Sequence, residues 1–110
     1  ERAEGLALMR PNDKLVGHVV TAFATRCPVS IKLFWRLLQM ADGITDICAA
    51  LTLDYHLAMR MIRRGDYIEG VRAVLVDRDN APKWSPNSLA LVDKALLDAL
   101  FDEDGLPPLC

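Results

Sequence analysis

Asp66 and Glu69, two carboxylates three residues apart, are the side chains of this sequence whose types and spacing best match a catalytic pair. Such a pair could supply a general acid and a general base. The same spacing is that of a capping box, in which the first side chain accepts from a free amide of the opening turn and the second reaches back to the amide of the cap. Because the cap accounts for both residues, we expect them to start a helix and to take no part in catalysis.

Other catalytic patterns are absent from the sequence. It contains no G-x-S-x-G elbow, no H-E-x-x-H pair and no phosphate-cradling glycine loop. Nothing in the sequence indicates partners that would make His18 a metal ligand. The three cysteines, Cys27, Cys48 and Cys110, have no metal-ligand spacing, so neither a disulfide framework nor a zinc site is expected, and an intracellular, reducing compartment is favoured. We predict no catalytic residue, no metal site and no separate cofactor in this chain.

The charge pattern excludes some classes of partner. A net charge of -2 and a pI of about 5.6 argue against a basic surface for nucleic acid. Between Arg60 and Lys83 the basic residues outnumber the acidic ones, and we expect these charges to be solvated helix ends. No apolar run reaches the roughly eighteen residues that would cross a bilayer. We therefore expect neither a nucleic acid nor a membrane as a partner.

The elements that must position Asp66 and Glu69 are helices. The expected helices cover about residues 1–9, 13–26, 30–40, 46–64, 67–76, 86–92 and 94–101, and residues 102–110 are expected to form a loose tail. The expected N-caps are Asn12 or Asp13, Thr45, Ser85 and Asp93, with Pro86 at a first helical position and Gly65 as a left-handed C-terminal cap. The sequence thus predicts one helical region of the all-α class.

The segment from Tyr67 to Val76 carries two conflicting patterns. Its density of β-branched residues favours a strand. The capping box and the stripe of Ile68, Val71 and Leu75 at helical spacing favour a helix. We predict a helix over the whole segment.

The run D-Y-x-E-G-V-R-A-V-L-x-D-x-D-x-x-P-K-W, from Asp66 to Trp84, resembles the C-terminal signature of the 3-hydroxyisobutyryl-CoA hydrolase branch of the enoyl-CoA hydratase/isomerase (crotonase) superfamily. Two earlier runs resemble other elements of that branch in the same order; they contain Pro28, Ser30, Ile31, Lys32 and Arg36, and then Asp54, Tyr55, Leu57, Ala58 and Met61. Cys27 replaces a usual serine and His56 a usual arginine, which changes the local polar contacts. The resemblance extends from about Leu15 to Phe101.

The resemblance implies that the chain is the helical C-terminal lid and oligomerisation region of a crotonase-type α/β enzyme. The catalytic core would lie upstream of Glu1, so we expect this chain to be a piece of a longer polypeptide and inactive by itself. The whole enzyme would hydrolyse an acyl-CoA thioester, that of 3-hydroxyisobutyrate in valine catabolism, with coenzyme A as part of the substrate. It would be a homo-oligomer of the mitochondrial matrix in a eukaryote or of the cytoplasm in a bacterium.

The resemblance also suggests two residues for substrate binding. Several members of the superfamily place a lysine near the CoA phosphates from the region that corresponds to Val76 to Arg78. This sequence has Asp77 there, with Arg78 beside it. We therefore expect Arg78 and Lys83 to be the contacts with the CoA phosphates.

Two alternatives stay open. The whole protein could be an enoyl-CoA hydratase or isomerase of the same superfamily, because one fold hosts many reactions. The chain could also be a non-catalytic helical module that binds a partner through apolar helix faces. The helix expected over residues 46–64 would be about 28 Å long. In so small a domain this helix would leave apolar surface uncovered. Such a surface is typical of a helix that packs against a larger body.

Overall fold

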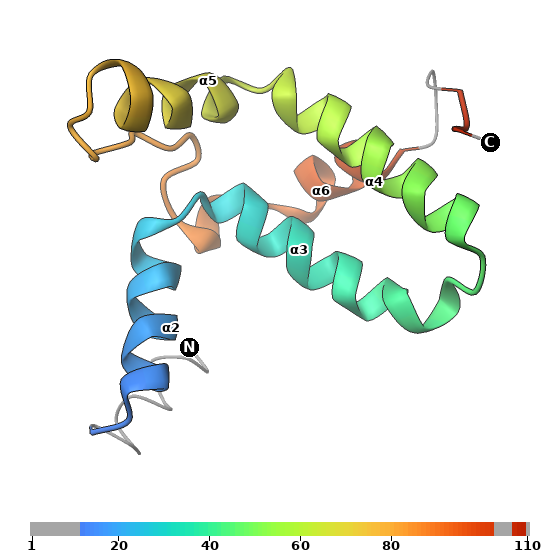
Figure 1. The fold of residues 1–110 in the computed structure, drawn as a ribbon, viewed down its shortest axis with the longest axis horizontal. Helices are drawn as coiled ribbons and strands as arrows, with labels where there is room; N and C mark the ends of the chain where they lie inside the picture. The colour runs from blue at the N-terminus through green and yellow to red at the C-terminus, as the bar shows by residue number, and fades with distance from the viewer. Residues whose placement is uncertain (1–11, 103–106, 110) are drawn as a thin grey trace.

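Two helices joined by a short turn, α3 (Pro28–Met40) and α4 (Ile47–Ile62), form the frame of the molecule, and α6 (Lys94–Phe101) packs against both (Figure 1). The structure is a computed structural model that describes residues 12–102 and 107–109. The core cluster lies where these three helices meet, around Val29, Leu57, Val92 and Leu100, which are all nearly inaccessible to solvent. Apolar burial at this meeting point is what holds the frame together.

Basic side chains from both frame helices attach α6 and the residues before it. Lys32 Nζ donates to the carbonyl of Val92 at 2.8 Å, and Arg60 Nη1 donates to the carbonyl of Leu100 at 2.8 Å. Arg36 pairs with Asp98 and places its guanidinium 5.0 Å from the centre of the Phe101 ring. Lys32 and Arg36 lie four residues apart on α3, so one face of this helix carries both attachments.

The helix α2 (Lys14–Thr25) extends away from the frame (Figure 1). Asp13 caps it by accepting from the amides of Leu15 and Val16, which confirms one of the two expected caps. No residue of α2 is buried. Its C-terminal end is held by Trp84, whose Nε1 donates to the carbonyl of Thr25 at 3.0 Å. Within the described part of the chain, this bond anchors the C-terminal end of α2 to the loop that contains Trp84.

The segment after α4 is helical, as predicted, and contains no strand. It consists of α5 (Gly65–Val71), which continues into a π-helical turn (Arg72–Val76). Residues 77–84 form a loop, and a single 3-10 turn (Leu89–Leu91) precedes α6. The described residues as a whole contain helices, turns and loops but no strand, which confirms the all-α class. The β-branched residues of the segment sit on a helix because intrinsic propensity is weaker than tertiary context.

Several expected boundaries were wrong. The helix α3 begins at Pro28 and not at Ser30, because the fixed φ of proline suits a first helical turn. The cap of α4 is Asp46, which accepts from the amides of Cys48 and Ala49, and not Thr45. Asp93 does cap α6 by accepting from the amide of Leu96. An aspartate fills each of the side-chain caps of α2, α4 and α6.

Two other expectations in this part of the chain were also wrong. Gly65 is the first residue of α5 and has no left-handed backbone conformation, so it does not cap α4. The helix expected over residues 86–92 is replaced by the 3-10 turn, because the backbone of Ser85 is bound to other side chains and does not start a helix. The helix expected over residues 1–9 lies outside the described residues, as does most of the tail expected over 102–110.

The molecule is more open than a globular chain of its length. Its radius of gyration is 16.0 Å, whereas a compact domain of this length would have about 13 Å. Its accessible surface is 8223 Å², against about 6,100 Å² for a folded monomer of this mass. In the described residues no helix has both the length and the apolar character required to cross a membrane.

Candidate functional site

Asp66 is buried and joins three parts of the chain. Its side chain, whose residue is only 5% exposed, accepts from the amide of Ser85 at 2.9 Å and lies 3.6 Å from Cys27 Sγ. Arg64 Nη2 lies 3.8 Å from the same carboxylate and donates to the carbonyl of Ser85. The N-cap of α5 is Arg64, with no side-chain cap bond. The capping box is therefore wrong, because Asp66 accepts from distant residues instead of from its own helix.

Arg72 binds three carboxylates that surround it in sequence. Its Nε and Nη2 donate to the two oxygens of Glu69 at 2.9 and 2.7 Å. Its Nη1 donates to Asp77 at 2.7 Å and to Asp79 at 2.8 Å. Glu69 also accepts from the amide of Lys83 at 2.8 Å. We call Arg72, Glu69, Asp77 and Asp79 the arginine clamp; it fixes the loop after the π-helical turn against α5.

The clamp changes the acidity of its members. The hydrogen bonds from Arg72, followed by the one from the Lys83 amide, lower the pKa of Glu69 from 4.5 to about 2. Bonds from Arg72 and from the amide of Ala81 lower the pKa of Asp79, and the carboxylates raise the pKa of Arg72. A carboxylate that is so weakly basic makes a poor proton acceptor near neutral pH. The geometry thus gives Glu69 a structural task.

The loop that the clamp fixes ends at Trp84, whose ring lies close to α5 at Gly70. A Cβ atom built on Gly70 would lie 3.3 Å from Trp84 Cη2, so the absence of a side chain allows this approach. Trp84 and Gly70 border an apolar hollow of about 670 Å³. The other lining residues are Cys27, which precedes α3, and residues of α3, α4, α5 and the π-helical turn: Ser30, Leu33, Phe34, Met61, Asp66, Tyr67, Val71, Val74 and Leu75.

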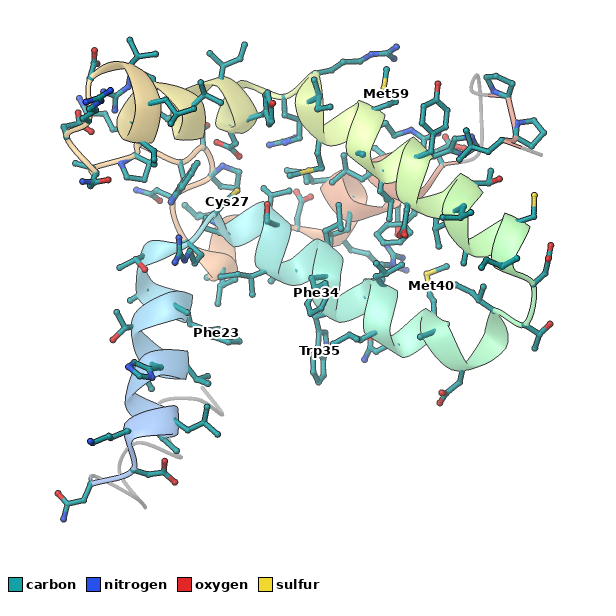
Figure 2. The ribbon with its side chains drawn as sticks, viewed as in Figure 1. Phe23, Cys27, Phe34, Trp35, Met40 and Met59 are labelled. Carbon is teal, nitrogen blue, oxygen red and sulfur yellow. The ribbon has the colours of Figure 1, made fainter. Side chains whose placement is uncertain are left out.

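Apolar side chains beside the hollow face solvent. Ile68, Leu75 and Val76 are 67%, 66% and 70% exposed, and Tyr67 and Val74 are also more than half exposed. We call these five residues of α5 and the π-helical turn the apolar flank. Figure 2 shows further aromatic side chains, Phe23 of α2 and Trp35 of α3, extending into the open angle between those two helices. Scattered apolar residues are normal on a surface, whereas a contiguous patch marks a contact site.

The two expected phosphate contacts lie on the clamped loop but not in one hollow. Lys83 lines a second, more polar hollow of about 430 Å³ together with Arg64, Gly65, Asp66 and Ser85. Arg78 is exposed, has a left-handed φ of 54°, and makes no hydrogen bond or ion pair with the described residues. It is not among the residues that line this second hollow. The structure therefore brings Arg64, and not Arg78, to the same hollow as Lys83.

The structure also shows the state of two cysteines and the position of His18. Cys27 carries a free thiol, whereas Cys48 is disulfide-bonded, a single bond that the expectation of no disulfide framework did not foresee. Sequence spacing did not reveal the bond, because it depends on which segments the fold brings to α4. His18 lies exposed on α2. Among residues 12–102 and 107–109, no three histidine, cysteine or acidic side chains are grouped as metal ligands.

The clamp is the feature that sequence reasoning missed. We expected the charges between Arg60 and Lys83 to be solvated helix ends, and for Arg72, Glu69, Asp77 and Asp79 this was wrong. A signal was present, since Glu69 precedes Arg72 by three residues and two aspartates follow it within seven. Spacing alone does not show that the loop turns back, which requires the left-handed Arg78 and Asn80.

Comparison with known proteins places the chain. Residues 3–101 match the family described as enoyl-CoA hydratase/isomerase. The chain is 35% identical over 82 residues to a protein of Xenopus laevis named 3-hydroxyisobutyryl-CoA hydrolase, mitochondrial; this match covers 74% of the chain and 21% of the relative. Proteins with the same name from Gallus gallus and Homo sapiens are 39% and 38% identical, with 71% of the chain and 20% of each relative covered. The chain thus spans about a fifth of the length of these relatives. From the match over nearly its whole length, the chain belongs to the enoyl-CoA hydratase/isomerase family.

Proposed function

We propose that this chain is the helical C-terminal region of a CoA thioester hydrolase that acts on 3-hydroxyisobutyryl-CoA in valine catabolism. The observation that carries the proposal is its identity of 35–39% to relatives that bear the name of this hydrolase. The candidate acid–base pair of the chain is engaged elsewhere, since Asp66 is buried against Ser85 and Glu69 is bound to Arg72. The chain alone is therefore expected to be inactive.

The reaction would be the addition of water to the thioester carbonyl, with departure of the CoA thiol and release of the free acid. It requires a nucleophile or a base that activates water, and hydrogen-bond donors for the developing oxyanion. The resemblance assigns these groups to upstream carboxylates and to two backbone amides of a crotonase core. No position of this chain matches those carboxylates. Its own share would be to cover the acyl-CoA site.

We propose that the apolar flank and the hollow beside it are the surface that lies against that core and contributes to contacts between subunits. Each of the five residues of the flank is more than half exposed. In the same elements and the following loop, seven hydrogen bonds of Glu69, Arg72 and Asp79 hold the backbone in place. A surface that is held rigid and left apolar is suited to docking. The accessible surface of the chain exceeds that of a compact monomer by roughly 2,000 Å², an excess to which α2, with no buried residue, also contributes.

For the substrate, we propose that Lys83 and Arg78 contact the phosphates of coenzyme A. Both lie exposed on the clamped loop, where their side chains are free to reach an anion. In the full-length protein, Lys83→Gln and Arg78→Gln should each raise KM for the acyl-CoA and leave kcat nearly unchanged. The reason is that each variant loses a contact that binds the substrate and the transition state equally. The same variants assayed with an acyl-pantetheine, which lacks the nucleotide phosphates, should behave as the unchanged protein does. An equal loss with both substrates would contradict the assignment.

The decisive experiment is an assay of the full-length polypeptide with 3-hydroxyisobutyryl-CoA. Release of the CoA thiol, detected with a thiol reagent, is the expected result, and the 110-residue chain alone serves as the inactive control. Hydration of an enoyl-CoA without thiol release would favour a hydratase or isomerase, the alternative that the description of the family itself supports. If the full-length protein shows neither thiol release nor hydration, and the isolated chain is stable and monodisperse, the result would favour a helical interaction module.

The location follows as part of the same proposal. The relatives are named as mitochondrial proteins. We infer an intracellular enzyme that resides in the mitochondrial matrix if the source is a eukaryote and in the cytoplasm if it is a bacterium. Fractionation of cells that express the full-length protein, followed by the thioesterase assay on each fraction, tests this location.

A further inference from the structure

The second, polar hollow of about 430 Å³ lies where the residues that follow α4 meet the clamped loop. Arg64 and Lys83 line it from these two segments, together with Gly65, Asp66 and Ser85. A water molecule occupies about 30 Å³ of the liquid, so the hollow has room for a small polyatomic ion and part of its hydration water. Its lining holds two cations, one carboxylate and one hydroxyl, which suits a charged ligand.

Arg64 has hydrogen-bond donors to spare. Its Nη2 donates to the carbonyl of Ser85 at 3.2 Å and lies 3.8 Å from the Asp66 carboxylate, which is longer than a hydrogen bond. Its Nε is buried and has no partner among the described residues. A guanidinium carries five N–H donors in a planar fork that fits carboxylate and phosphate oxygens. A guanidinium that is bonded so incompletely gains free energy when an anion accepts from it.

Lys83 supplies the second cation. Its side chain is exposed, and its Nζ makes no hydrogen bond or ion pair with the described residues. Only its backbone is fixed, since its amide donates to Glu69 at 2.8 Å. The hydrogen bond from Arg72 is the main cause that lowers the pKa of Asp79, and the charge of Lys83 adds only a small part. Because Asp79 is bound by Arg72, the Nζ of Lys83 stays available to an ion in the hollow.

Asp66 does not close the hollow to anions. Its residue is only 5% exposed, and its carboxylate already accepts from the amide of Ser85 at 2.9 Å, with the Cys27 thiol 3.6 Å from its other oxygen. With this one carboxylate against the two cations Arg64 and Lys83, the lining keeps a surplus of one positive charge. The hydroxyl of Ser85, which has no partner among the described residues, adds a third donor.

We propose that this hollow binds a phosphate group, with Arg64 and Lys83 on two sides of it and the Ser85 hydroxyl as a third donor. A phosphate presents its oxygens in tetrahedral directions, so it can accept from three groups of different segments, whereas a carboxylate offers two oxygens in one plane. The bound group would tie the clamped loop to the residues that follow α4.

The phosphate can come from two sources. One is the nucleotide part of coenzyme A, and in that case the inference rests on the proposed function. The other is free phosphate, and in that case it does not. Coenzyme A carries more than one phosphate, so Arg78, which lies outside the lining of the hollow, and this site can bind different ones.

Calorimetric titration of the full-length protein tests the site with inorganic phosphate, with coenzyme A and with pantetheine, which has no phosphate. We expect inorganic phosphate to bind, and Arg64→Gln and Lys83→Gln each to weaken its binding by about tenfold, because each removes a charge-assisted hydrogen bond. Arg64→Lys should recover part of the loss through its charge. Arg63→Gln, the matched control, removes an exposed charge outside the hollow and should bind phosphate as the unchanged protein does.

Competition between the probes identifies the source. If the phosphate is that of coenzyme A, the two variants also weaken coenzyme A binding and leave pantetheine binding unchanged, and coenzyme A displaces inorganic phosphate. If it is free phosphate, the variants weaken phosphate binding alone and coenzyme A does not displace it. A failure to release thiol in the hydrolase assay would contradict the proposed function and leave the phosphate site in place.

Two outcomes would overturn the proposal. One is that neither inorganic phosphate nor coenzyme A binds more weakly to Lys83→Gln and Arg64→Gln than to the unchanged protein. The other is an equal loss with Arg63→Gln, which would mean that overall charge and not the hollow attracts the phosphate. The Nζ of Lys83 contacts no described residue, so Lys83→Gln should fold even if Arg64→Gln does not, and it carries the test by itself.

Discussion

The two halves of this molecule are held together by different forces. The frame of α3, α4 and α6 buries Val29, Leu57, Val92 and Leu100 at its centre. The half formed by α5, the π-helical turn and the following loop has one fully buried apolar residue in those elements, Ala73, and depends on the arginine clamp. The first half also leaves large apolar side chains exposed, among them Phe34, Trp35 and Ile47, which are 58%, 60% and 77% accessible to solvent. The second half uses polar contacts for its own order and leaves the apolar flank exposed.

The difference lies in what holds each half in place, since both halves present apolar side chains to solvent. A segment held by apolar burial loses its order when the apolar side chains are turned outward, whereas a segment held by a clamp can keep its order and still present them. The residues of the family signature belong to the clamped half.

The largest expected effect is in the core. Leu57→Ala removes a side chain that is 4% exposed and should reduce the free energy of unfolding by about 2–5 kcal/mol, from lost transfer free energy and a cavity. Leu75→Ala, at 66% exposure, should change it by less than about 0.5 kcal/mol. Urea unfolding of both variants measures the contrast. Similar losses at the two positions would mean that the flank is buried in solution.

The next effect concerns the clamp. Arg72→Met leaves Glu69, Asp77 and Asp79 close together without their cation, so the loop should separate from α5 and carry Trp84 off Gly70. A red shift of the tryptophan fluorescence, and faster exchange of the Lys83 amide, should report this. Arg78→Met removes the same charge from the same loop and should leave both signals unchanged. A shift of equal size in Arg78→Met would refute the clamp as the cause.

The clamp also predicts a dependence of stability on pH. The pKa of Glu69 is about 2 in the folded chain and 4.5 otherwise. Its contribution is therefore complete above about pH 4.5 and is lost as the pH falls towards 2, because the unfolded state takes up the proton first. Unfolding measured at several pH values should show this decline, and Glu69→Gln should make it shallower. An unchanged slope in Glu69→Gln would count against the low pKa.

The smallest effect separates two glycines of α5. Gly65→Ala should stabilise the chain by up to about 1 kcal/mol, because its Cβ would meet nothing within 4 Å. Gly70→Ala should give a smaller gain or a loss, since its Cβ would lie 3.3 Å from Trp84. Thermal unfolding followed by circular dichroism compares the two. If Gly70→Ala were the more stable variant, the packing of Trp84 on α5 would be wrong.

The sequence was sufficient for the parts of the fold that depend on neighbouring residues. Asp13 and Asp93 were identified as caps, and the stripe of Ile68, Val71 and Leu75 predicted a helix where β-branched residues favour a strand. The parts that depend on distant residues were missed. Asp66 accepts from Ser85, nineteen positions away, and this contact also removes Ser85 as a helix start.

For the candidate site too, features local in sequence could be predicted, whereas contacts between distant residues could not. The family was accessible from the run between Asp66 and Trp84, because a signature is local in sequence. The arginine clamp was not, since it forms only after the loop reverses at two left-handed residues, Arg78 and Asn80. The disulfide of Cys48 likewise depends on which segment the fold brings to α4.

The central claim is that the apolar flank is a docking surface for a larger body of the same polypeptide. Covalent footprinting of exposed side chains, applied to the full-length protein and to the 110-residue chain, tests it most directly at Ile68, Leu75 and Val76. The account predicts strong labelling of these residues in the short chain and about tenfold weaker labelling in the full-length protein. Equal labelling in both would show that nothing covers the flank and would contradict the claim.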